Sequence, residues 1–99
     1  MNNASQKNEI LRAHDINWVR EIDMTLLVND QSGKTFILRG VEATIWDWLT
    51  LNFPYSKMTG SLATLLGTPI SEAESRLNTI LRQWVENGLL IIAENTAHD

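Results

Sequence analysis

The chain has 99 residues, of which 43% are hydrophobic and 20% charged, with a formal net charge of −4 and no cysteine. This length suits a single domain whose one core buries about two-thirds of the surface that the unfolded chain exposes. The lack of cysteine excludes disulfides, thiolate zinc sites and cysteine nucleophiles. The negative net charge disfavours a phosphate-rich partner, although a local basic stripe can override the overall sign.

The two ends of the chain are polar and lack hydrophobic periodicity. Residues 1–9 and 94–99 are therefore expected to form flexible tails around a single domain over residues 10–93. No segment resembles a secretory signal, and no run approaches the roughly 18 apolar residues of a membrane helix, so we expect a cytoplasmic protein that does not enter membranes. His14 and His98 have no nearby ligand set, so neither a metal nor a cofactor is expected.

Alternating apolar and polar residues predict two short strands, at residues 16–21 and 24–29. This period of two is typical of strands with one buried face, so each strand is expected to direct every second side chain to the same side. The residues that share a face are Ile16, Trp18 and Arg20 in the first strand, and Leu26 and Val28 in the second.

A turn at residues 30–33 is expected to lead into a third strand at residues 34–39. Asp30 supplies a side chain that accepts a backbone hydrogen bond, and Gly33 adopts positive φ without a steric penalty. A three-stranded antiparallel meander is the simplest arrangement of these segments. In the third strand, Phe36 and Leu38 are predicted to face one way, and Thr35, Ile37 and Arg39 the other.

Near Gly40 the hydrophobic period changes from two residues to the helical value of about 3.6. Trp46 lies to one side of the apolar face of this first helix, whereas Trp48 lies on it. We therefore expect one of the two tryptophans to be partly exposed. The apolar face consists of Val41, Ile45, Trp48 and Leu49.

A second helix is expected from near Ser56 to Gly67, and Thr68 and Pro69 form a corner after it. The length of this helix is about three turns. Its closing glycine is typical of a helix that ends in the left-handed conformation.

The longest helix is expected to begin at Ser71. Its hydroxyl would accept the Glu74 amide while that glutamate reaches back to the serine amide, which is a capping box. Gly88 is expected to close the helix, with Leu89 packing back near Trp84 before an extended end. The buried stripe of this helix is predicted to be Ala73, Leu77, Ile80, Leu81, Trp84 and Val85.

Three strands followed by three helices, with a tight corner between the last two, predict an α+β, winged-helix-like fold. One set of residues, with its order and spacing, also resembles a known family. The set comprises Trp18, Arg20, residues 30–33, 36–38 and 40–49, Leu81, Trp84 and residues 88–90. In these features the chain resembles, from about residue 10 to residue 90, the PqqD-like family, the peptide-recognition domains also called RiPP recognition elements. The Arg39-Gly40 pair departs from relatives, which often have asparagine after the leucine to open the helix.

The resemblance implies a non-catalytic adaptor without cofactors. Such a domain binds the leader segment of a ribosomally made precursor peptide and presents it to a peptide-modifying enzyme, such as a radical enzyme, a protease or a cyclase. The leader would add a strand to the free edge of residues 34–39, with its apolar side chains in the cleft beside the third helix. The expected peptide-binding residues are Lys34, Thr35, Phe36, Ile37, Leu38, Arg39, Arg76, Leu77, Ile80, Leu81 and Trp84.

Each of these residues also has a purely structural interpretation. Phe36 and Leu38 are expected mainly in the core, which leaves Thr35 and Ile37 as the better groove candidates, in part through their backbone. The apolar residues of the third helix belong to the core as well, unless the margin of their stripe borders a cleft. The arginines of that helix either form a solvated face or contact an acidic peptide.

Other classes of function are less consistent with the residues. An enzyme is not expected, because no glycine-rich phosphate loop appears and no serine or threonine matches a histidine in a structured segment. A winged-helix DNA-binding regulator is the stronger alternative, since residues 71–87 would occupy the position of a recognition helix. In that helix, however, Glu72, Glu74 and Glu86 outnumber two arginines, so no nucleic-acid partner is expected. A structural subunit of an enzyme complex is a third possibility.

Overall fold

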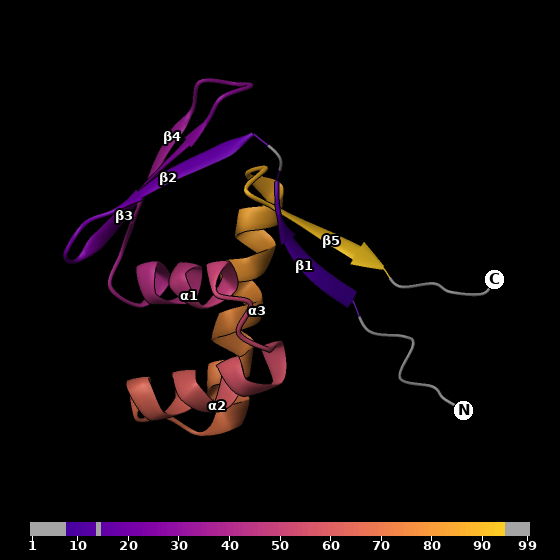
Figure 1. The fold of residues 1–99 in the computed structure, drawn as a ribbon. Helices are drawn as coiled ribbons and strands as arrows, with labels where there is room; N and C mark the ends of the chain where they lie inside the picture. The colour runs from indigo at the N-terminus through magenta and orange to yellow at the C-terminus, as the bar shows by residue number, and fades with distance from the viewer. Residues whose placement is uncertain (1–7, 14, 95–99) are drawn as a thin grey trace.

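A computed structural model describes residues 8–13 and 15–94 of the chain, and it shows an α+β fold in which three antiparallel strands precede three helices (Figure 1). The winged-helix-like order predicted from the sequence is confirmed. Most of the two expected tails, together with His14 and His98, lies outside the described residues. The elements in chain order are β1 (Asn8–Arg12), β2 (Ile16–Arg20), β3 (Met24–Asn29), β4 (Thr35–Arg39), α1 (Val41–Thr50), α2 (Tyr55–Leu66), α3 (Ile70–Glu86) and β5 (Leu90–Glu94).

Strands β2, β3 and β4 form the predicted antiparallel meander, with β3 in the centre. Side chains alternate between the two faces of the sheet, and one face packs against the helices. On that face Thr25 and Leu27 of β3 are fully buried. Leu26 and Val28, which share a face as predicted, therefore lie on the opposite, outer side of the sheet and are only half-buried.

A second, two-stranded sheet joins the two ends of the domain. Strand β1 pairs antiparallel with β5, so that Asn8 lies opposite Glu94 and Arg12 opposite Leu90. The Ala13 amide extends the contact by donating to the carbonyl of Leu89 at 3.0 Å. Strand β1 was not predicted, and its first two residues fall within the expected amino-terminal tail. Its partner strand lies about eighty positions away in the chain, so no local sequence pattern indicates the pairing.

The start of α3 differs from the prediction. The helix begins at Ile70, with Pro69 as its N-cap residue, and no side chain caps it. The expected capping box of Ser71 and Glu74 is therefore wrong. Proline at this position has φ of −62°, which directs the chain into the helix one residue earlier and leaves the serine inside the first turn, away from the N-cap position.

The end of α3 is as predicted. Gly88 has φ of 78°, its amide donates to the carbonyl of Val85 at 3.0 Å, and the Leu89 amide donates to the carbonyl of Trp84 at 2.8 Å. These two bonds define a Schellman motif, which requires a left-handed residue that glycine supplies most readily. Leu89 is consequently turned back into the core, where it is fully buried.

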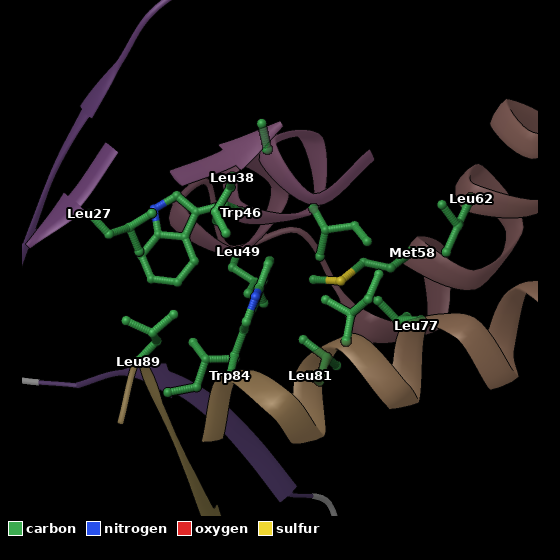
Figure 2. Packing of buried hydrophobic residues seen from close by; sticks show 14 of the residues in the cluster. Leu27, Leu38, Trp46, Leu49, Met58, Leu62, Leu77, Leu81, Trp84 and Leu89 are labelled. Carbon is green, nitrogen blue, oxygen red and sulfur yellow. The ribbon is translucent and has the colours of Figure 1, made fainter. Parts of the chain in front are cut away.

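The hydrophobic core lies between the sheet, α1, α2 and α3 (Figure 2). Trp46 is fully buried in it, whereas Trp48 is half-buried and packs against Phe53 with ring centroids 5.6 Å apart. One tryptophan of this pair is partly exposed, as predicted; the sequence left open which one, and it is Trp48, which packs against the core without being fully buried. The actual face of α1 is rotated, and its buried residues are Ala43, Ile45, Trp46 and Leu49.

Three tryptophans from different elements form a row through this core. Trp46 makes edge-on contacts with Trp18 of β2 and Trp84 of α3, at centroid distances of 5.8 and 5.5 Å. The guanidinium of Arg12 in β1 lies 4.7 Å from the Trp18 ring centroid and closes the row at the surface. Aromatic pairs of this geometry stabilise by about 0.5 to 1.5 kcal/mol beyond their buried area, so the row ties both sheets to the helices.

Among residues 8–13 and 15–94, no helix combines the length and the apolar character needed to cross a bilayer.

Candidate functional site

Strand β4 has a free edge. Within the described part of the chain it pairs with β3 alone. The amide of Asn29, the last residue of β3, donates to the carbonyl of Lys34, just before β4, at 2.9 Å. Because hydrogen-bonded pairs recur at every second residue of an antiparallel ladder, the residues of β4 that bond to β3 are Phe36 and Leu38.

The backbone groups of Thr35, Ile37 and Arg39 are consequently directed away from β3. Such an edge offers a row of unpaired amides and carbonyls to another extended chain. Because β4 contains no proline, each of these three outward residues keeps its amide. They form a short template for an added strand, which carries the positive charge of Arg39 at one end and follows that of Lys34 at the other.

A groove of about 590 Å³ continues from the end of this edge. It lies where β4 ends and α1 begins, and α3 forms its other wall. The α3 residues of the wall recur at intervals of three and four, which is one flank of a helix. The lining residues are Arg39, Val41, Glu42, Glu72, Ser75, Arg76, Thr79 and Ile80.

Four charges border the groove. In the described residues the single ion pair is Arg20 with Asp47, so the groove residues Arg39 and Arg76 are not neutralised by a carboxylate in contact. Glu42 and Glu72 lie in the first turns of α1 and α3, where the helix dipole stabilises a negative charge. The two arginines are therefore the groove charges that a ligand carboxylate would most readily compensate.

The structure brings together only part of the site expected from the sequence. Arg39, Arg76 and Ile80 line the groove, and Ile80 is 7% exposed at its floor. Lys34, Thr35 and Ile37 are exposed along the β4 edge, Phe36 is half-buried and Leu38 is 4% exposed. The other expected residues of α3 pack in the core and do not line the groove; they are Leu77, Leu81 and Trp84.

Five groove residues were not expected from the sequence. Polar residues of α3 recur at intervals of three and four, so the helix has a polar flank. The sequence does not show which flank faces β4, because this depends on the rotation of the helix about its axis. Val41 was expected only on the apolar face of the first helix, although it and Glu42, the first two residues of α1, reach the groove. The unexpected residues are Val41, Glu42, Glu72, Ser75 and Thr79.

Comparisons of the chain with protein families, with curated proteins and with solved structures found no match. The fold and the geometry of the site therefore carry the functional argument.

Proposed function

We propose that this chain is a PqqD-like peptide-recognition domain. It is a non-catalytic adaptor that binds the leader segment of a ribosomally made precursor peptide and presents it to a peptide-modifying enzyme. The observation that carries the proposal is the outward backbone of Thr35, Ile37 and Arg39, which leads directly into the groove between α1 and α3. An extended peptide gains backbone hydrogen bonds on such an edge and places alternate side chains in the adjacent groove.

The groove favours a peptide with an apolar side chain followed or preceded by a carboxylate. Val41 and Ile80 provide an apolar lining, and Arg39 and Arg76 provide positive charge. An exposed ion pair contributes only about 0.2 to 1 kcal/mol. The arginines would therefore favour some leader peptides over others, whereas strand pairing would supply most of the binding affinity for all of them. Acidic leader segments are the best fit to this combination.

Proline at position 37 tests the edge directly. The Ile37 amide points away from β3, so Ile37→Pro removes a donor that the leader needs and no bond of the sheet. With a synthetic acidic leader peptide, taken from a gene adjacent to that of this protein, we expect titration calorimetry to show loss of binding. Circular dichroism and the melting temperature should show that the variant remains folded.

Leu38→Pro is the matched control. Its amide faces β3, so this variant is expected to lose a ladder bond and to unfold or melt at a much lower temperature. Normal leader binding by folded Ile37→Pro would contradict strand addition at β4. Sequence-dependent, salt-sensitive DNA binding in a mobility-shift assay would contradict the adaptor role altogether.

A further inference from the structure

The outer face of the three-stranded sheet carries a continuous apolar row. Val19 of β2 lies opposite Leu26 of β3, and Leu26 lies opposite Ile37 of β4. Val19 and Ile37 are 55% and 52% exposed. The solvent-facing side of an antiparallel sheet is ordinarily polar, so three aligned apolar residues across all its strands indicate a surface that another molecule covers.

A hollow adjoins this row at the turn between β2 and β3. Its volume is about 420 Å³, and Ile22 beside it is 98% exposed. Such a hollow accepts one or two apolar side chains of a partner, which is the arrangement of interaction hot spots. The residues that line it are Val19, Glu21, Ile22, Asp23, Met24 and Leu26.

The charge around the hollow is negative. Glu21 and Asp23 are exposed in its wall. The neighbouring cation, Arg20, is turned to the other face, where it pairs with Asp47 at 3.0 Å and donates to the carbonyls of Glu21 and Met24 at 3.1 and 3.0 Å. Its charge is therefore engaged there. Arg39, which lies opposite Met24 in the register, lines the leader groove and not the hollow, so Glu21 and Asp23 are the charges in the wall of the hollow and attract a positive partner.

We propose that the outer sheet face, with its hollow, binds a protein segment in which apolar side chains alternate with lysine or arginine. This surface meets the leader site at Ile37, whose side chain belongs to the outer face and whose backbone belongs to the β4 edge, and it does not include the groove between α1 and α3. An anionic lipid surface is disfavoured because the hollow is rimmed by carboxylates. A second copy of this chain, which also carries a net charge of −4, would bring like charges together.

A designed peptide of alternating leucine and lysine is the probe, and the same peptide with glutamate in place of lysine is its charge control. In nitrogen-15 spectra of the whole chain, we expect the lysine peptide to shift the amides of residues 19–26 and Ile37. We expect Ile22→Ser to weaken binding about tenfold, because it removes one apolar contact. Leu51→Ser, which removes a 76% exposed side chain that lines neither the hollow nor the groove, should leave the affinity unchanged.

Three results would overturn this assignment. The first is equal binding of the glutamate peptide, and the second is amide shifts confined to the leader groove. The third is self-association in sedimentation experiments that Ile22→Ser abolishes, because the face would then belong to a second copy. Arg76→Glu separates the two surfaces: it should weaken leader binding and leave the lysine peptide bound, so failure at one surface is distinguishable from failure at the other.

Discussion

Gly40 occupies a backbone conformation that joins β4 to α1. Its φ of 56° and ψ of −123° lie in a region that is open essentially to glycine. No side chain caps α1, and the Gly40 carbonyl accepts the Thr44 amide at 3.1 Å instead. The glycine therefore reverses the chain into α1 through its backbone alone.

Gly40→Ala is expected to lower the free energy of unfolding by about 1 to 3 kcal/mol, because alanine is strained at this φ and ψ even though no atom lies near its Cβ. Gly60→Ala is the matched control. Gly60 lies inside α2 with open space around it, so alanine there should raise stability by about 0.5 to 1 kcal/mol. Urea unfolding measures both changes. Equal stability of Gly40→Ala and the parent would show that the turn is not constrained as described.

The two tryptophans of α1 show what residue patterns leave open. An apolar stripe defines a helical face to within about one residue on either side. Within that margin the pattern does not decide whether Trp46 or Trp48 is the buried tryptophan. The contacts of Trp46 with Trp18 and Trp84 decide it. The burial of Leu38, and the exposure of Ile37 beside it, were predictable because a strand has two faces and a period of two.

At the level of elements, α2 and α3 are linked by a side-chain hydrogen bond from the Tyr55 hydroxyl to Asn78. Burial, and then the negative charge of Glu74, raises the pKa of Tyr55 above its ordinary value of 10.0. The folded state therefore holds this proton more tightly than the unfolded state does. The resulting stabilisation is fully present below the unfolded pKa and is lost as the pH rises through the folded one.

The chain has one tyrosine, so near-ultraviolet absorbance reports the titration of Tyr55 alone. We expect its midpoint in the folded protein to lie above that in urea. Urea unfolding should also show a steeper loss of stability in the parent than in Tyr55→Phe once the pH exceeds 10.0. A midpoint at or below the unfolded value would contradict the partial desolvation of this hydroxyl beside Asn78 of α3.

Local pattern predicted the strands of the meander and the three helices, but not the pairing of β1 with β5. Strand alternation and helix-closing glycines act over a few residues, and both gave the correct elements. The pairing joins chain ends, and nothing near Asn8 or Arg12 distinguishes a strand from a polar tail. The same limit applies to the groove, whose walls come from three elements and whose α3 flank depends on how that helix packs.

At the scale of the whole molecule, one sheet presents both of the surfaces that we propose for binding. Its β4 edge continues into the groove beside α3, and its outer face carries the apolar row that ends at Ile37. An adaptor needs two such surfaces, because it must hold a peptide and dock on an enzyme at once. In the proposed arrangement the leader uses the backbone of Ile37, whereas the second partner uses its side chain.

Amide hydrogen exchange tests strand addition at β4 most directly, because it distinguishes the β4 amides that bond to β3 from those that point away from it. In the free protein we expect slow exchange at Phe36 and Leu38, which bond to β3, and fast exchange at Thr35, Ile37 and Arg39. A bound leader peptide should slow the second set and leave the first almost unchanged. Protection confined to other elements, or none at Ile37 while the leader is bound, would contradict strand addition at β4.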